Sequence, residues 1–225
     1  MKVELKHCTP MPVLIEAIRT CYDSMGRSDS QEIEGDFILG IKDKELIQRV
    51  VDDGHGSTLE HLTYNFKITG LPRFILQELV RHRIASYSVK STRFTLAELK
   101  YETPFVISEW DEDDSRFDSV FYDIERADKY LYLSGINILD ERSIQALEWL
   151  RQEIVSGTYT KDEIKQIVPE NYLCDLMMTI NARSLCNLLY LRSNKRAHFL
   201  IQQLAAYVFG NIPAQHKFIF EKSMQ

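Results

Sequence analysis

Apolar and polar residues alternate in two stretches of the chain, and this period of two predicts β-strands. The first stretch covers residues 2–7. The second covers residues 62–69, and its apolar face consists of Leu62, Tyr64, Phe66 and Ile68. Gly70 is expected to turn the chain directly after this strand. The segment 171–180 fits either a strand or a buried helix, and it is assigned to a strand.

Elsewhere apolar residues recur about every 3.6 positions, which predicts helices. Proline, glycine and an Asp140 cap mark several of their ends. The expected helices cover residues 10–22, 43–53, 72–80, 115–134, 140–156, 160–167, 181–191 and 194–209. Residues 24–36 are expected to form a mobile loop, and residues 99–112 an irregular segment that enters an acidic run at 111–114. The pattern predicts an α+β fold, with a small mixed or antiparallel sheet packed with several helices in a single domain, residues 1–225.

Composition supports an ordinary globular protein, because 44% of the residues are hydrophobic and 27% are charged. No apolar run reaches the roughly 18 residues that a membrane-spanning helix needs, and the N-terminus lacks the layout of a signal peptide. A cytoplasmic location without a membrane partner is therefore expected. The four cysteines are scattered and form no Cys-x-x-Cys pair, so they are expected to be reduced and mostly buried.

Residues 81–94 concentrate positive charge in a chain whose net charge is −6. The stretch combines four cationic side chains and His82 with four Ser or Thr hydroxyls. Guanidinium groups are forked donors that suit phosphates and nucleobase carbonyls. A local basic patch on an acidic protein favours a small anionic ligand over a long polyanion. A solvated surface and a nucleic-acid-binding module remain as alternatives.

Two further segments carry candidate binding residues. In the segment 55–61, His55, Glu60 and His61 allow a polar structural loop, a ligand contact or a metal site, although their spacing is not His-Glu-x-x-His. In the helix predicted at 181–191, Arg183 and Asn187 share a face. Arg192 either points into a binding site or interacts with the C-terminal end of this helix. Dinucleotide-binding, P-loop and zinc-finger motifs are absent from the sequence.

Three blocks together resemble the flavin-dependent thymidylate synthases, in that family's order. They are His55 with Glu60-His61, the signature from Arg81-His82-Arg83 through Ser91 to Arg93-Phe94, and Asn181-x-Arg183-x-x-x-Asn187-x-x-x-x-Arg192. The resemblance implies that dUMP becomes dTMP, with the carbon from methylenetetrahydrofolate and the hydride from reduced FAD. It further implies that NADPH reduces the flavin and that a homotetramer holds FAD where subunits meet. No metal site is expected, because the spacing of His55, Glu60 and His61 is weak evidence for one.

The resemblance also implies roles for individual residues. Arg192 corresponds to the catalytic arginine that favours ionisation of the pyrimidine at N3. The implied cofactor-binding residues are Ser57, Arg81, His82, Arg83, Val89, Asn181, Arg183 and Asn187. The implied substrate-binding residues are Glu78, Arg81, Val89, Lys90, Ser91, Thr92, Arg93, Lys165 and Arg192.

The chain departs from the family pattern at several of these positions. Val89 stands where many members have Glu, so any role for it must be a backbone role. Glu78 stands where many have Gln, Lys165 where many have Arg, and Arg196 where many have His. Because of these departures, the alternative that the chain is a regulatory homologue, which binds nucleotides without turnover, is kept. The motif could also suggest Ser91 as a nucleophile, but the sequence shows no base assigned to activate it, and substrate binding is expected instead.

Overall fold

The computed structural model describes residues 1–110 and 117–224, so the acidic run expected at 111–114 lies outside the described residues. The chain divides into two compact units. The first unit comprises Met1–Thr69, Glu78–Ser88 and Leu176–Gln225, and the second comprises Gly70–Gln77 and Val89–Asp175. Within the described residues, no helix is both long and apolar enough to cross a membrane.

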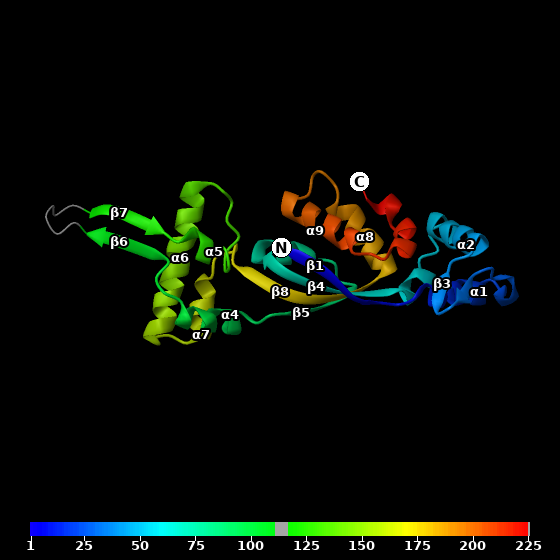
Figure 1. Cartoon of the computed structure of the whole chain (residues 1–225), viewed down its shortest axis with the longest axis horizontal. Coiled ribbons are helices and arrows are strands. Elements are labelled where there is room, and N and C mark those ends of the chain that lie inside the picture. Colours follow the sequence, from blue (N-terminus) through cyan, green and yellow to red (C-terminus); the bar gives the residue numbers. More distant parts are fainter. Residues whose placement is uncertain (111–116, 225) are drawn as a thin grey trace. The chain divides into compact units, whose positions relative to one another are not determined.

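The main sheet has four strands in the order β1-β4-β8-β5 (Figure 1). Their bounds are Lys2–Cys8 for β1, Thr63–Pro72 for β4, Ala85–Val89 for β5 and Leu173–Asn181 for β8. Strands β1 and β4 are antiparallel, with Lys2 opposite Thr69 and Cys8 opposite Tyr64. The predicted strands at 2–7, 62–69 and 171–180 are confirmed, whereas β5 lies in the basic stretch and was not predicted.

The first unit contains four helices of seven or more residues that belong wholly to it within the described chain: α1 (Met11–Cys21), α2 (Ile41–Asp52), α8 (Ala182–Arg192) and α9 (Phe199–Gly210). Helices α8 and α9 pack against each other, and α9 also contacts β1 (Figure 1). The shorter elements of this unit are η1 (Met25–Arg27), β2 (Gln31–Ile33), β3 (Asp36–Ile38), η2 (Thr58–His61), η5 (Ala214–Ile219) and η6 (Glu221–Ser223). The α+β assignment and the helices predicted at 10–22, 43–53 and 181–191 are therefore confirmed.

The alternation along β4 produces a buried face, as predicted. Leu62 immediately before the strand and Tyr64, Phe66 and Ile68 within it are completely buried in the first unit. Side chains on one face of a strand lie two residues apart, so a single packed layer can bury all of them.

Two expectations for the first unit are wrong. The loop expected at 24–36 contains a hairpin in which β2 pairs with β3, and Glu34 and Gly35 form the turn with φ values of 54° and 87°. A two-residue hairpin turn favours this left-handed backbone, and Glu-Gly signals it only weakly. The helix expected at 194–209 begins at Phe199, because the His198 side chain caps it by accepting a hydrogen bond from the Leu200 N–H.

A buried ion pair joins the first two helices. The Asp43 side chain is fully buried and accepts hydrogen bonds from Arg19, from the Ser28 hydroxyl at 2.6 Å and from the Ser30 N–H at 3.2 Å. Burial disfavours ionisation of Asp43, but the hydrogen bonds from Ser28, Ser30 and Arg19 outweigh it and hold its pKa below the ordinary value. This carboxylate therefore connects α1, α2 and the segment between them.

The second unit contains α4 (Thr92–Glu98), η3 (Leu99–Tyr101), β6 (Val106–Trp110), β7 (Phe117–Tyr122), α5 (Ile124–Ala127), α6 (Asn137–Ser156), α7 (Lys161–Ile164) and η4 (Lys165–Ile167). Helix α3 (Arg73–Leu79) begins in this unit and ends in the first. A core of its own includes Leu99, Phe105, Leu131, Leu147 and Tyr172.

Predictions for the second unit are partly wrong. A helix was expected at 115–134, but its described residues form β7 and the short helix α5, and β7 pairs antiparallel with β6. Residues 106–110 are therefore a strand, although 99–112 was expected to be irregular. The turn expected at Gly70 is also wrong, because β4 continues to Pro72. Asp140 does not cap α6 but lies in its first turn, where it accepts hydrogen bonds from the N–H groups of the preceding Ser134 and Gly135.

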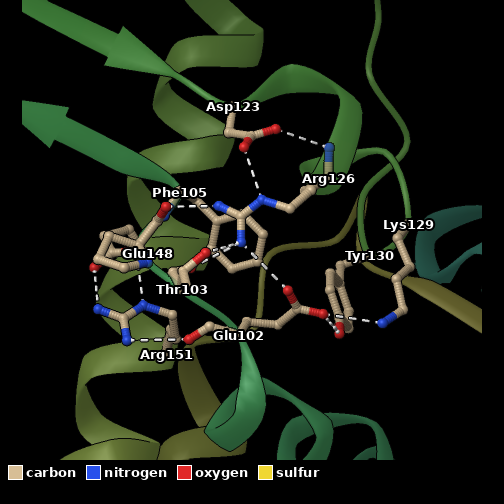
Figure 2. A network of polar contacts seen from close by, with 10 residues as sticks. Glu102, Thr103, Phe105, Asp123, Arg126, Lys129, Tyr130, Glu148 and Arg151 are labelled. Atoms are coloured by element: carbon tan, nitrogen blue, oxygen red, sulfur yellow. Dashed lines mark hydrogen bonds and ion pairs between the residues drawn. The ribbon is translucent and has the colours of Figure 1, made fainter.

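Ion pairs and backbone contacts stabilise the second unit around the loop before β6 (Figure 2). The nearly buried Glu148 accepts hydrogen bonds from the Phe105 N–H at 2.8 Å and from Arg151 at 2.7 and 2.9 Å. Arg126 donates to Asp123 at 2.7 Å and to the Pro104 carbonyl at 2.6 Å. Helix α6 and the neighbourhood of α5 are thus tied to the same loop.

Candidate functional site

A hollow of about 610 Å³ in the first unit contains seven of the residues singled out from the sequence. Its lining includes four arginines and one carboxylate, so positive charge dominates. The lining residues are Glu60, Arg81, His82, Arg83, Ile84, Arg183, Ser184, Asn187, Leu191 and Arg192. The hollow therefore suits a ligand that carries negative charge.

The segment 81–83 follows the end of α3, and local hydrogen bonds hold it in place. The His82 N–H donates to the Leu79 carbonyl at 3.1 Å. The Tyr87 hydroxyl lies 2.9 Å from the His82 carbonyl and 3.1 Å from the Leu79 carbonyl. Because Tyr87 belongs to β5, the sheet positions the Arg-His-Arg segment at the hollow. Burial raises the pKa of Tyr87 to about 12, so its hydroxyl stays protonated as a donor.

Helix α8 brings the third sequence block to the same hollow. Asn181 caps the helix, since its side-chain oxygen accepts a hydrogen bond from the Ser184 N–H at 2.8 Å. Arg183 and Asn187 are one turn apart and both line the hollow. Arg192 is the last residue of the helix, and its side chain is only 16% exposed.

Arg192 is held by two residues of the first unit. Its guanidinium donates to the Glu78 carboxylate at 2.7 Å, to the Glu78 carbonyl at 2.8 Å and to Nε2 of His82 at 2.9 Å. The Glu78 carboxylate also forms an ion pair with the exposed Arg81 at 3.1 Å. Both positions offered by the sequence therefore apply to Arg192, which ends α8 and also lines the hollow.

His82 is neutral in this environment. Burial and the positive charge of Arg192 together lower its pKa to about 4, although Glu78 acts in the opposite direction. A neutral imidazole keeps one unprotonated nitrogen, and the Arg192 N–H requires that nitrogen to be Nε2.

The Arg183 side chain lies close to the backbone of the first sequence block, residues 55–61, at Gly56. It forms an ion pair with Glu60 at 2.7 Å, and both side chains are largely exposed. A Cβ atom at Gly56 would lie 2.8 Å from Nε of Arg183, so the glycine makes this close approach possible. The neighbouring Ser57 is exposed at the start of η2.

The remaining predicted residues lie in the second unit and form a separate group there. Arg93 donates to Asp162 at 2.9 Å, and Lys165 donates to the same carboxylate at 2.7 Å. Ser91 caps α4, and the Thr92 hydroxyl accepts a hydrogen bond from Arg73 at 2.9 Å. The two other members of the group are Val89, whose side chain is exposed, and Lys90, which pairs with Glu98 at 2.8 Å.

Sequence reasoning missed several residues of these two groups. Ser184 and Leu191 line the hollow, and their spacing from Asn187 on a helix could have identified them. Asp162 was missed although it lies one helical turn before Lys165. Ile84 carried no signal, because an isolated apolar residue after a basic triplet does not indicate a ligand site.

The cysteines and the block at 55–61 show no competing chemistry in the described residues. All four cysteines are free, but only Cys174 is buried and Cys21 is exposed, so the expectation of mostly buried thiols is wrong. Burial raises the pKa of Cys174 to about 11, and it also raises those of Cys8 and Cys186. Across residues 1–110 and 117–224, no cluster of three His, Cys, Asp or Glu side chains is placed to hold a metal ion.

Comparison with known proteins identifies close relatives of this chain. Residues 4–214 match the family model described as thymidylate synthase complementing protein. The flavin-dependent thymidylate synthase of Campylobacter jejuni (strain RM1221) is 44% identical over 222 residues, which are 98% of this chain and 96% of the relative. That of Helicobacter pylori (strain J99) is 42% identical, with all of both chains covered. A crystal structure of the Helicobacter pylori enzyme ThyX complexed with FAD and dUMP matches with a TM-score of 0.85 and 42% identity, covering all of both chains.

Proposed function

Because this chain belongs to the flavin-dependent thymidylate synthase family, we propose that it converts dUMP to dTMP using FAD. Methylenetetrahydrofolate is the carbon donor and NADPH the reductant in this proposal. The observation that carries it is the convergence of Arg81, His82, Arg83, Arg183 and Arg192 on one hollow. These residues come from two of the three sequence blocks, and Glu60, which lines the same hollow, comes from the third.

The hollow fits a flavin nucleotide in charge and in chemistry. A diphosphate needs cationic and hydrogen-bonding groups, and Arg81, Arg83 and Arg183 supply forked donors. Asn181 commits its side-chain oxygen to the helix cap, which leaves its amide N–H groups for a ligand. Ser57, His82, Asn187 and the backbone of Val89 complete the proposed flavin-binding set. When bound, FAD supplies the hydride for the reaction.

Arg192 is proposed to contact the pyrimidine and to stabilise negative charge that develops there. Three of its five N–H groups are used by Glu78 and His82, so two remain for a ligand. A guanidinium already held by the protein does not have to reorganise when charge develops, and such preorganised donors contribute substantially to catalysis. Glu78 orients Arg192 and is proposed to lie beside the substrate as well.

The group in the second unit is proposed to bind the nucleotide and its phosphate. Arg93 and Lys165 share the Asp162 carboxylate, so two cations that suit a phosphate are already adjacent. The proposed set also includes Lys90, Ser91, Thr92 and the backbone of Val89. Lys165 acts as a point charge, because an ammonium cannot bind a phosphate bidentately as an arginine does.

Ser91 is proposed to bind substrate and not to act as a nucleophile. Its hydroxyl caps α4 at 3.4 Å from the Arg93 N–H. Among the described residues, no histidine, lysine or carboxylate is hydrogen-bonded to it, and a serine nucleophile needs such a base. Detection of a covalent nucleotide adduct on Ser91 by mass spectrometry would overturn this assignment.

We further propose that the chain acts as one catalytic domain over residues 1–225 in a cytoplasmic homotetramer with shared active sites. The family match at 4–214 draws on both compact units, which supports a single functional domain. The partners are then small molecules and other copies of the chain, without nucleic acid or membrane. Light scattering of the flavin-bound protein tests the assembly.

The test of the reaction combines flavin binding with product analysis. NADPH oxidation is followed with and without dUMP and methylenetetrahydrofolate, and dTMP is identified by chromatography. The variant Arg192→Ala is expected to lose dTMP formation by a factor on the order of 10²–10³, as is typical for removal of a preorganised donor. The control Arg142→Ala alters an exposed arginine on α6 that contacts Gln145, and it should retain activity.

Two other outcomes would contradict the proposal in different ways. Flavin binding without dTMP would indicate a regulatory homologue, which the departures at Val89, Lys165 and Arg196 favour as the second candidate. Affinity that grows with polynucleotide length in a protein without flavin would instead indicate a nucleic-acid-binding module.

A further inference from the structure

The side chain of His82 makes a contact that flavin binding does not explain. Its Nε2 atom lies 2.9 Å from Nε of Arg192, and the two residues are 110 positions apart in the sequence. An arginine has no acceptor, so the hydrogen bond must run from the guanidinium to the imidazole. Nε2 is consequently unprotonated, and the ring proton of the neutral histidine is on Nδ1.

The surroundings of His82 preserve this arrangement. His82 is 8% exposed, so water competes little for its Nε2 lone pair. The charged or titratable groups that face it are Arg192 from α8, Glu78 from α3 and Tyr87 from β5. A proton on Nε2 would place a second cation against Arg192, and burial also opposes that charge.

The three hydrogen bonds of Arg192 fix different parts of its guanidinium. Glu78 receives one bond on its carboxylate and one on its carbonyl, from the two terminal nitrogens. His82 receives the bond from Nε, which is the nitrogen nearest the aliphatic stem. A planar group held at all three nitrogens cannot rotate about its last bonds without breaking one of these contacts.

We propose that His82 is a positioning residue whose unprotonated Nε2 fixes the orientation of Arg192 for the pyrimidine. It acts in addition to any contact that His82 makes with the flavin. The effect on substrate rests on the proposed function, because it requires Arg192 to contact dUMP. The hydrogen bond between His82 and Arg192 does not depend on that function and is tested separately.

The first experiment measures the protonation of His82 directly. The flavin-bound protein is labelled with ¹⁵N-histidine, and the His82 signals are assigned by their loss in His82→Gln. The expected result at neutral pH is a pyridine-type Nε2 and a protonated Nδ1. A protonated Nε2 would overturn the proposal, whatever the protein does with dUMP.

The second experiment exploits the different reach of two amide side chains. The oxygen of glutamine can occupy the place of Nε2, whereas asparagine is one methylene shorter and cannot reach Arg192. At saturating FAD, His82→Asn should weaken dUMP binding by about tenfold, the effect of losing one hydrogen bond to a charged group. His82→Gln should remain within about threefold of the original protein. Binding is read from the change that dUMP causes in the flavin spectrum.

A double-mutant cycle shows whether His82 acts through Arg192. Arg192→Lys removes the donor at Nε, so His82→Asn should have less than about a threefold further effect in that background. The proposal would be overturned if His82→Asn weakened dUMP binding as much in the Arg192→Lys background as in the unaltered protein. It would also be overturned if His82→Gln and His82→Asn weakened dUMP binding equally. Flavin affinity is measured for each variant, so that a loss of cofactor is not mistaken for a loss of positioning. Failure of the unaltered protein to form dTMP would count against the proposed function, whereas the ¹⁵N result would still decide the hydrogen bond.

Discussion

Replacing Asp43 with Ala should lower the free energy of unfolding of the first unit by about 3–5 kcal/mol, because it leaves a buried charge without its partner. Arg19 is 4% exposed and, among the residues that the structure describes, would retain only the Ser24 carbonyl, to which it donates at 3.1 Å. The hydroxyls of Ser28 and Ser30 would also lose their acceptor. Removal of a buried partner is costly in this way even where the intact pair contributes little net stability.

The double variant Arg19→Met, Asp43→Leu removes both charges and should recover a large part of this loss, since an apolar pair avoids the cost of desolvating ions. Asp52→Asn is the matched control, because Asp52 is an exposed carboxylate on the same helix, α2, and is paired with Lys222. Its effect on stability should be small, as for other exposed pairs.

Hydrogen exchange of the amides in α1 and α2, measured against denaturant concentration, is the appropriate assay for these variants. The two tryptophans, Trp110 and Trp149, belong to the second unit, so tryptophan fluorescence does not report on Asp43. A loss below about 1 kcal/mol in Asp43→Ala would refute the reasoning, since it would mean that Arg19 finds another partner or reaches water.

The pH dependence provides an independent test of the same carboxylate. The pKa of Asp43 in the folded protein lies below its ordinary value of 3.8. The contribution of Asp43 to stability is therefore fully present above its pKa in the unfolded chain, and it is lost as the pH falls through its pKa in the folded protein. Stability measured between about pH 5 and pH 2 should fall less steeply in Asp43→Ala than in the unaltered protein.

Three further predictions concern other parts of the two units. Burial lowers the pKa of His216 to about 4, so the unfolded chain binds a proton at this residue first as the pH falls below 6.5. The free energy of unfolding should therefore decline from pH 6.5 towards pH 4, and His216→Phe should reduce the slope of this decline by the equivalent of up to one proton. Gly56→Ala should weaken FAD binding by about tenfold, because the added Cβ displaces Arg183. The control Gly26→Ala should leave FAD binding unchanged, since there is open space around Gly26, and titration followed by the flavin spectrum measures both affinities. Glu148→Ala should destabilise the second unit by about 3–5 kcal/mol in a denaturation followed by tryptophan fluorescence, and an unchanged midpoint would contradict the role of Glu148 in joining α6 to the loop before β6.

Local patterns in the sequence predicted the elements whose stability is mainly local. The alternation at 62–69 correctly predicted which face of β4 is buried, and Asn181 was correctly placed at the start of α8. A period of two or a capping side chain acts within a few residues, so a single sequence reveals it. The β6–β7 pair was missed because a short apolar run does not distinguish a strand from a helix until its partner is known.

The candidate site shows the same division between chemistry and geometry. The residues Arg81, His82, Arg83, Arg183 and Arg192 were selected from their types and spacing, and those same side chains meet at the hollow. Their partners were not predictable, because an ion pair such as Arg93 with Asp162 joins positions 69 residues apart. Glu78 is expected beside a substrate from the sequence, and the structure shows that its carboxylate accepts a hydrogen bond from Arg192.

The sequence by itself determined the family, the α+β character and the identity of the cationic residues, since side-chain chemistry and short-range periodicity are properties of the chain. Tertiary structure alone decided which carboxylates neutralise those cations, that the His82 nitrogen facing Arg192 is an acceptor, and that Asp43 is buried. The physical reason is that burial and hydrogen-bond partners depend on distant segments meeting in space. The protonation state of a side chain follows from that meeting and not from its neighbours in sequence.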